Sequence, residues 1–261
     1  MSKKICFFDI DGTLWDAKGT IPVSTISAIR QLHKNGHLAF INTGRTRAFV
    51  HSEDLLGIGF DGIVAGCGTQ IEYNGEFIFY KKIEDELAIK TVETVKKYGL
   101  KPILEGKDYL YFDNEDFGDD PYGEFIKSDM GDNLLSIKHN WGKWEFSKLS
   151  CATKSDHTQE CFDELSPYYH FLVHNPEVAE FVPLGFTKGT GIQKICELFD
   201  TDIADTYAFG DSVNDIDMLK IAGTSIVMGN GTDVAKKEAD HITTDILDDG
   251  IFNACKHFGL I

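Results

Sequence analysis

The sequence predicts an α/β protein with a parallel sheet, interrupted by an α+β insertion. Short apolar runs alternate with amphipathic helical patterns at both ends of the 261-residue chain, which is typical of βαβ construction. Between residues 83 and 183 this alternation gives way to a mixture of helices and short strands, and it returns after Phe186. We therefore expect residues 1–82 and 184–261 to form one core domain, and residues 83–183 to form an inserted domain with its own core.

The elements of the first part follow from apolar runs, stop signals and turns. Residues 4–8 are a short apolar run of the kind that forms a buried strand, and the Asn-Gly pair at 74–75 lies between apolar alternations, which is a strong hairpin signal. In chain order, the expected elements are a strand at 4–8, a helix at 24–35, a strand at 37–42, a helix at about 46–56, a strand at 62–66 and a hairpin at 70–80.

The same signals predict the elements of the insertion and of the last part. In the insertion we expect a helix at 85–98, short strands near 101–112, 145–151 and 169–174, and a helix between the last two. After it we expect a helix at 189–199, a strand at 205–209, a helix at 214–221, a strand at 224–228 and a helix near 247–257. The acidic run at 113–120 is expected to be a solvated loop, because it lacks the spacing and the terminal Glu of an EF-hand.

Composition limits the classes of function and the compartment. The formal net charge is −17, and the segment 83–183 carries −11 of it, so neither part has the basic character of a nucleic-acid-binding domain. Six cysteines show no CxxC spacing, which favours free thiols in a reducing compartment. The first apolar run is broken by Asp9, too early for a signal peptide, and no run reaches membrane-spanning length. We expect a cytoplasmic protein without a membrane or nucleic-acid partner; its oligomeric state is left open.

Two acidic turns, each after an apolar run, predict one metal and phosphate site. Asp9 and Asp11 follow the first strand, and Asp211 and Asp215 follow a strand near the other end of the chain. Because the carboxyl ends of parallel strands meet at one edge, these acids are expected to converge there. Four converging carboxylates would repel one another, and a divalent cation removes that repulsion. Mg²⁺ prefers such oxygen ligands and phosphate partners.

The first acidic pair has the arrangement for two complementary chemical roles. Asp9 and Asp11 are two residues apart, so an extended backbone sends both carboxylates to one side, and Gly12 lets the chain turn. One carboxylate can attack phosphorus to form an aspartyl-phosphate, while the other, with a pKa raised by like charge, can act as the general acid. The alternative is a pair of solvated turn acids, which the buried-type strand before them disfavours.

Three further segments are candidates for binding phosphate. Thr43, Gly44 and Arg45 are expected at a helix N-terminus, where backbone N–H groups bind phosphate oxygens. The alternative for the arginine is an ion pair with Glu53 or Asp54. Lys188 begins a predicted helix and can neutralise a phosphate or hold Asp9, although a lone lysine is more often exposed. In the second acidic turn Asn214 can orient metal-bound water or substrate, or serve as an ordinary cap.

With these segments assembled, the chain resembles the haloacid dehalogenase (HAD) superfamily of phosphohydrolases, and within it the Cof-type hydrolases. The motifs that carry the resemblance are Phe8-Asp9-Ile10-Asp11-Gly12-Thr13-Leu14, Asn42-Thr43-Gly44-Arg45, Lys188-Gly189 and Gly210-Asp211-Ser212-Val213-Asn214-Asp215. Their order and long gaps also match, and only residues 83–183 lack a signature. One segment departs from the pattern: Gly66-Cys67-Gly68-Thr69 stands where many relatives have Asn-Gly-Ala.

The resemblance implies a Rossmann-like core with a large α/β cap inserted after the third strand, and it implies a role for each motif residue. Asp9 is implied as the nucleophile and a Mg²⁺ ligand, and Asp11 as the acid/base and a ligand through its backbone carbonyl. The other implied roles are Asp211 as a metal ligand, Thr43 and Lys188 as phosphate binders, and Asn214 and Asp215 as the rest of the metal and phosphate shell.

The function that these residues predict is a Mg²⁺-dependent phosphomonoesterase acting on a small phosphorylated metabolite, such as a sugar phosphate, through an aspartyl-phosphate. A phosphotransferase or mutase acting on sugar phosphates is a second possibility, and a non-catalytic sensor of a phosphorylated metabolite is a third. The leaving group cannot be read from the sequence. Candidate residues of the insertion, chosen by residue type alone, are Tyr109, Tyr111, Lys143, Trp144 and His174.

Overall fold

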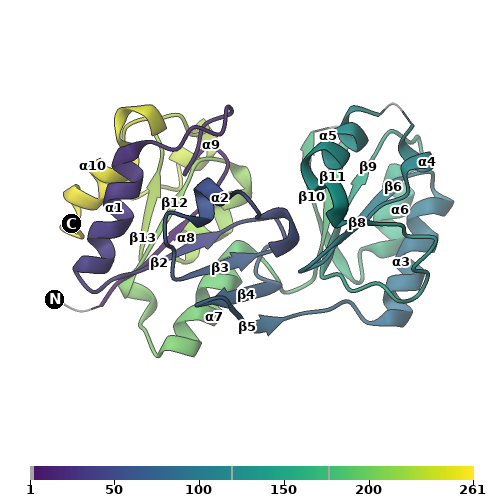
Figure 1. The fold of residues 1–261 in the computed structure, drawn as a ribbon, viewed down its shortest axis with the longest axis horizontal. Helices are drawn as coiled ribbons and strands as arrows, with labels where there is room; N and C mark the ends of the chain where they lie inside the picture. The colour runs from purple at the N-terminus through teal and green to yellow at the C-terminus, as the bar shows by residue number, and fades with distance from the viewer. Residues whose placement is uncertain (1–2, 119, 176) are drawn as a thin grey trace. The chain divides into compact units, whose positions relative to one another are not determined.

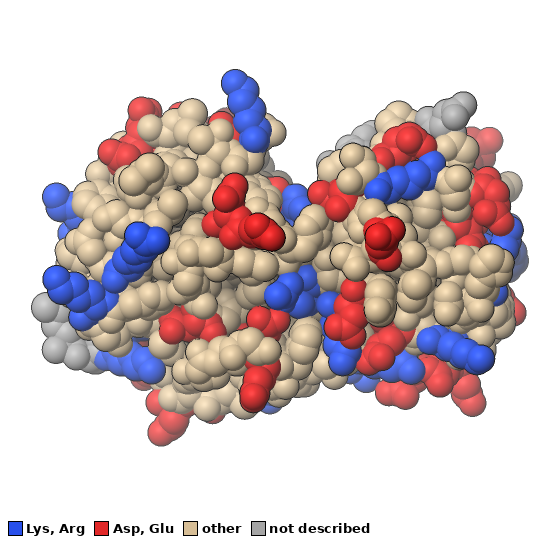
Figure 2. All heavy atoms as spheres, viewed as in Figure 1, with Lys and Arg blue, Asp and Glu red and all other residues tan. Residues whose placement is uncertain are grey.

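The computed structural model describes residues 3–118, 120–175 and 177–261, and its contacts divide the chain into two compact units (Figure 1). The core unit comprises Met1–Gly44, His51–Phe79 and Phe186–Ile261, and the inserted unit comprises Arg45–Val50 and Tyr80–Gly185. No helix in the described ranges combines the length and apolarity that crossing a membrane requires. On the face shown in Figure 2, acidic and basic side chains are interspersed over each unit.

The core unit is built on an eight-stranded sheet with the order β14-β13-β12-β1-β2-β3-β4-β5. The strands from β14 to β3 run parallel, and β4 is antiparallel to β3. Their bounds are β1 Ile5–Phe8, β2 Leu38–Asn42, β3 Gly62–Ala65, β4 Gln70–Tyr73, β5 Glu76–Tyr80, β12 Thr206–Gly210, β13 Thr224–Val227 and β14 His241–Ile242. Asn74 and Gly75 join β4 to β5 with positive φ angles, as a two-residue hairpin turn requires.

Helices cover both faces of this sheet. Ile5 and Phe7 of β1 pack with apolar residues of α7 (Lys188–Phe199) and α8 (Ile216–Ile221) on one face. The buried residues of α1 (Val23–Lys34) and α10 (Gly250–His257) belong to the other layer, where these two helices lie side by side (Figure 1). Two one-turn helices, α2 (Glu53–Leu56) and α9 (Asp233–Lys236), complete the unit. The prediction of a parallel-sheet α/β core is confirmed.

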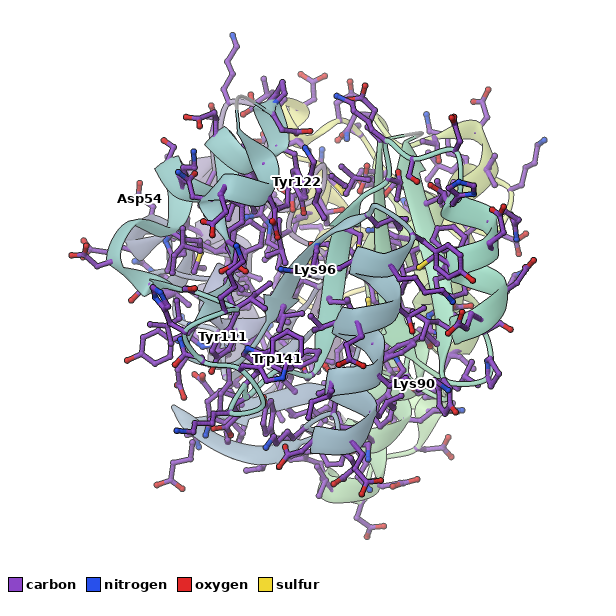
Figure 3. The ribbon with its side chains drawn as sticks, turned by 90° about the vertical axis from the view of Figure 1, so that its right-hand side faces the viewer. Asp54, Lys90, Lys96, Tyr111, Tyr122 and Trp141 are labelled. Carbon is purple, nitrogen blue, oxygen red and sulfur yellow. The ribbon has the colours of Figure 1, made fainter. Side chains whose placement is uncertain are left out.

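The inserted unit has a six-stranded sheet of its own with the order β10-β11-β9-β6-β7-β8. The strands are β6 Lys101–Glu105, β7 Leu110–Tyr111, β8 Leu134–Leu135, β9 Lys148–Ala152, β10 Tyr169–Asn175 and β11 Val178–Pro183, and the helices are α3 Asp85–Lys97, α4 Asn114–Phe117, α5 Pro121–Met130 and α6 Thr158–Leu165. Apolar residues of α3 and α6 pack on one face of this sheet, and those of α5 belong to a second cluster with β6 and β9. Figure 3 shows Lys90 and Lys96 on α3, in front of the sheet.

Two expectations for single segments are wrong, and one helix was missed. The helix at about 46–56 is instead a short 3-10 turn at Arg47–Phe49 followed by α2, because Ala48 is buried in the second apolar cluster of the inserted unit and Ser52 starts a new turn as the N-cap of α2. The acidic run holds α4, and its Asp113 is buried, with bonds from Ser136 and Lys96. The α5 helix was not expected; Pro121 begins it after the capping side chain of Asp120.

The residues proposed by type alone for the inserted unit differ in their exposure to solvent. Tyr111 and Trp144 are buried members of its main apolar cluster, so they stabilise the unit and do not present a binding surface. Tyr109 and Lys143 are exposed. The side chain of His174 lies outside the described residues.

Candidate active site

The site lies at the carboxyl edge of the core sheet, where the strand order reverses. β1 has β12 on one side and β2 on the other, and all three strands run parallel. Phe8 pairs with Phe209, and the Asp9 N–H donates to the Phe209 carbonyl at 3.0 Å. Open α/β sheets bind ligands at such a reversal, because the loops after the two strands diverge and leave a crevice. The pairing of β1 with β12 brings Asp9 and Asp211 to one edge.

Three carboxylates meet at this edge. One oxygen from each of Asp9, Asp211 and Asp215 lies within 4.8 Å of the others. Asp9 and Asp215 are buried, and Asp211 is half-buried. Gly12 allows Asp211 to approach, because the φ of Gly12 is +87° and a Cβ there would overlap the Asp211 carboxylate. The two acidic turns therefore form one cluster.

Lys188 places a buried ammonium between two of these carboxylates. Its Nζ donates to Asp9 Oδ1 at 2.5 Å and to Asp215 Oδ1 at 2.7 Å, and 1% of its side chain is exposed. Burial of a charge is costly unless the charge is paired, and the N-terminus of α7, where Lys188 lies, disfavours a cation. The two carboxylates offset both costs. The alternative of an ordinary exposed lysine is wrong.

Asp215 also holds the turn that carries Asp211. Its Oδ2 accepts the backbone N–H groups of Asp211 at 2.9 Å and of Ser212 at 3.1 Å, while its Oδ1 accepts from Lys188. The hydroxyl of Ser212 donates to Asn214 Oδ1 at 2.7 Å. The second acidic turn is thus held by its own side chains, which fixes the backbone position of Asp211.

The cluster has more negative than positive charge. Burial and the charge of Asp215 raise the pKa of Asp211 to about 7. The pKa of Asp9 is also raised, chiefly by burial and then by Asp215, against the opposing effect of Lys188. Burial lowers the pKa of Lys188, but Asp215 and Asp9 together raise it above its ordinary value. Three carboxylates thus share one ammonium, and an additional cation would relieve their repulsion.

One oxygen of the cluster has no hydrogen-bond partner among the described residues. Asp211 Oδ1 is buried and accepts no hydrogen bond from them. A buried carboxylate oxygen without a donor is unfavourable unless a ligand or a cation satisfies it. The cluster offers oxygen ligands and no nitrogen or sulfur, which is the donor set that hard divalent cations such as Mg²⁺ prefer. The residues present therefore fit a divalent metal.

Asp11 lies at the same loop but outside the group of three carboxylates. It is exposed, and its Oδ1 accepts a hydrogen bond from the indole Nε1 of Trp15 at 2.9 Å. The loop is held from the other side by Asn230, whose Nδ2 donates to the Gly12 carbonyl at 2.8 Å. The structure thus separates the two acids of the first motif: Asp9 is buried in the cluster, and Asp11 is exposed at its edge.

The predicted phosphate-binding segment is split between the two units. Thr43 is buried at the end of β2, its N–H donates to the Val64 carbonyl at 2.9 Å, and it belongs to the core unit with Gly44. Arg45 belongs to the inserted unit, where its guanidinium lies 5.0 Å from the centroid of the Phe49 ring. Because no α-helix begins at Arg45, the helix N-terminus expected at this segment is absent.

The loop after β3 contains residues 66–69, which depart from the family pattern, and its backbone angles and packing account for the glycines there. Gly66, Cys67 and Gly68 all have positive φ angles, and the Cys67 N–H donates to the Thr43 carbonyl at 3.1 Å. A Cβ at Gly68 would lie 2.7 Å from the Thr187 carbonyl oxygen, so only glycine lets the loop pack this closely on the start of α7. The loop ties the Thr43 segment to the helix that carries Lys188.

Two residues of the site had no role assigned from the sequence. Asn42 is buried at the end of β2, and its Nδ2 donates to the Lys188 carbonyl at 3.0 Å. A polar residue that closes an apolar strand is a signal that could have identified it. Trp15 follows Asp11 by four residues, and only the turn of the loop brings its indole to the carboxylate.

Comparisons with known proteins identify the family of the chain. A family model for haloacid dehalogenase-like hydrolases matches residues 6–255. YkrA of Bacillus subtilis is 32% identical, with 100% of each chain covered. The 5-amino-6-(5-phospho-D-ribitylamino)uracil phosphatase YcsE of the same organism is 26% identical, covering 98% of this chain and 96% of that protein. The HAD subclass IIB sugar phosphatase BT4131 has a solved structure with a TM-score of 0.82 and 28% identity, covering 99% of this chain and 100% of that one. The resemblance seen in the motifs is confirmed: the chain belongs to the haloacid dehalogenase-like hydrolases.

Proposed function

We propose that this hydrolase is a Mg²⁺-dependent phosphomonoesterase that releases phosphate from a small phosphorylated metabolite, such as a sugar phosphate. The observation that carries the proposal is the buried cluster of Asp9, Asp211 and Asp215 around the ammonium of Lys188. Such a cluster combines a nucleophile, a cation site and a positive charge for phosphate in one place. Relatives named as phosphatases for a ribitylaminouracil phosphate and for sugars support the substrate class.

The reaction proceeds in two displacements. The Asp9 carboxylate attacks phosphorus, the bond from phosphorus to the ester oxygen breaks, and Asp11 gives its proton to the departing oxygen. Asp11, now a carboxylate, then takes a proton from a water molecule whose oxygen attacks the aspartyl-phosphate. The bond from Asp9 to phosphorus breaks, which releases inorganic phosphate, regenerates the Asp9 carboxylate and leaves Asp11 protonated again.

The remaining residues bind and neutralise the phosphoryl group. We assign this role to Lys188 and to Thr43, Gly44, Arg45 and Asn214. Asp9, Asp211 and Asp215 would hold Mg²⁺ by their carboxylates, with Asp11 contributing its backbone carbonyl. When bound, the ion supplies positive charge to the phosphoryl oxygens and to the crowded carboxylates. Positioning and charge neutralisation supply most of the rate enhancement in phosphoryl transfer.

We assign the choice of leaving group to the inserted unit. The core cluster is composed of groups suited to a phosphoryl group and a cation. Every phosphate monoester presents the same phosphoryl group to such a cluster. Discrimination between leaving groups then needs contacts from elsewhere. The inserted unit, with its own sheet and core, is the part of the chain left for this role.

The test is release of inorganic phosphate from a panel of phosphorylated metabolites, with Mg²⁺ and with a chelator in its place. We expect turnover of a subset of the panel that requires the metal. Asp9→Asn should abolish it with an unchanged circular dichroism spectrum, whereas Asp16→Asn, in the same loop but outside the cluster, should retain it. Metal-independent, uniform rates across the panel, or full activity of Asp9→Asn, would refute the proposal.

A further inference from the structure

The loop between β1 and α1 folds back on itself so that Trp15 lies beside Asp11. The Leu14 and Trp15 N–H groups donate to the Ile10 carbonyl at 3.0 and 3.2 Å, and the Gly12 N–H donates to the Trp15 carbonyl at 3.1 Å. A backbone bridge joins Asp11 to Trp15. Leu14 is fully buried and anchors the turn in the core unit. The position of the Trp15 side chain is therefore set by the same turn that presents Asp11.

The contact between the two side chains has a direction. The indole Nε1 of Trp15 donates to Asp11 Oδ1 at 2.9 Å. An indole N–H can only donate, so the oxygen that it contacts must act as the acceptor. The carbonyl oxygen of a neutral carboxyl group is its better acceptor, so this contact favours Oδ2 as the oxygen that carries the proton. The bond also restricts the rotation of this exposed carboxyl group.

We propose that Trp15 is a positioning residue: its indole holds Asp11 Oδ1 so that Oδ2 is the oxygen that gives and takes the proton during ester cleavage. The inference rests on the proposed function, in which Asp11 is the acid that protonates the departing oxygen. Trp15 acts through Asp11 and has no assigned contact with phosphate or metal. Its effect should therefore depend on how much the leaving group needs a proton.

The test compares leaving groups in Trp15→Phe, which keeps an aromatic ring and removes the N–H. The quantity measured is kcat/KM, because it reports the first displacement and not the later hydrolysis of the aspartyl-phosphate. For an alkyl phosphate, whose alkoxide needs a proton, we expect a loss of about tenfold, the lower end of the range for a hydrogen bond to a charged group. For p-nitrophenyl phosphate, whose nitrophenolate leaves without a proton, we expect a change of less than about twofold. Equal losses on both substrates, or no loss on either, would overturn the proposal.

A matched control and a second measurement separate this inference from the proposed function. Trp141→Phe alters an exposed tryptophan of the inserted unit and should leave both kcat/KM values unchanged. In ¹⁵N–¹H spectra the chain's three indole signals can be assigned by these substitutions. Asp11→Ala should move the Trp15 indole proton upfield as the hydrogen bond is lost, and an unmoved signal would show that the contact is absent in solution. This result holds whether or not the wild type releases phosphate, so failure of the enzymatic proposal is recognised separately.

Discussion

Replacing Lys188 by methionine tests whether the buried ammonium compensates for the charge of the cluster. The substitution removes the only positive group that contacts Asp9 and Asp215 among the described hydrogen bonds, and it leaves a side chain of similar length. Methionine adapts to the vacated space, so the packing loss should be small. The effect on the free energy of unfolding is then mainly electrostatic.

The expected magnitude follows from the burial of all three groups. Lys188 and Asp215 have 1% and 0% of their side chains exposed, and Asp9 has 4%. Removing one partner from a buried ion pair typically costs about 3–5 kcal/mol, because the remaining charge is left desolvated. Uptake of a proton by one carboxylate limits this loss, so the deficit should be larger at pH 8 than at pH 6. Added Mg²⁺ should restore part of the stability, since it replaces the missing positive charge.

The assay is urea unfolding followed by circular dichroism, in chelator and in Mg²⁺, together with phosphate release. We expect Lys188→Met to lose stability by about 3–5 kcal/mol in chelator and to lose its activity. The matched control is Lys194→Met on the same helix, which removes a solvent-exposed pair with Glu197 at 3.0 Å and should cost less than about 1 kcal/mol. If Lys188→Met were as stable in chelator as Lys194→Met, the reasoning about compensated buried charge would be wrong.

Two further predictions concern the carboxylate cluster, and a third concerns a buried histidine elsewhere in the core unit. Gly12→Ala should lower the free energy of unfolding by about 1–2 kcal/mol and reduce phosphate release more than tenfold, because the added Cβ displaces the Asp211 carboxylate. The control is Gly19→Ala, which is also at positive φ but has open space around it and should lose stability alone. Equal activities in the two variants would contradict the close approach of Gly12 to Asp211. Asp211→Asn should weaken the rise in melting temperature that Mg²⁺ produces in the wild type, while Asp217→Asn on the exposed side of α8 should retain that rise. Calorimetric scans at several Mg²⁺ concentrations measure the rise in each variant, and equal rises would exclude Asp211 as a ligand. Burial lowers the pKa of His37, so the unfolded state binds the proton first and the free energy of unfolding should fall as the pH drops below about 6.5. Melting temperatures between pH 7.5 and 5.5 should fall more steeply in the wild type than in His37→Gln. Parallel curves would exclude His37 as the cause.

The sequence alone determined the fold class and identified the acids that meet in the cluster. Alternation of apolar runs and helical patterns predicted the strands β1, β2, β3, β12 and β13 close to their observed bounds, because burial between two layers of helices leaves a local pattern. The acidic turns were identifiable because carboxylates directly after buried strands have few structural explanations. Since parallel strands expose their carboxyl ends at one edge, the meeting of Asp9 and Asp211 could be inferred before any coordinates.

Only the tertiary structure decided which unit each of these residues belongs to, which partners it contacts and how deeply it is buried. Lys188 and Asp11 show this most clearly: the sequence left the lysine between a surface position and a contact with Asp9, and the structure buries it between two carboxylates, whereas the acid expected beside Asp9 is exposed and bonded to Trp15. Likewise, the segment after Thr43 is a short 3-10 turn followed by α2 instead of one helix, because Ala48 is buried in the second apolar cluster of the inserted unit and Ser52 starts a new turn. The physical reason is common to all three: local sequence specifies backbone preference and polarity, but burial and hydrogen-bond partners depend on which distant segments pack against a residue.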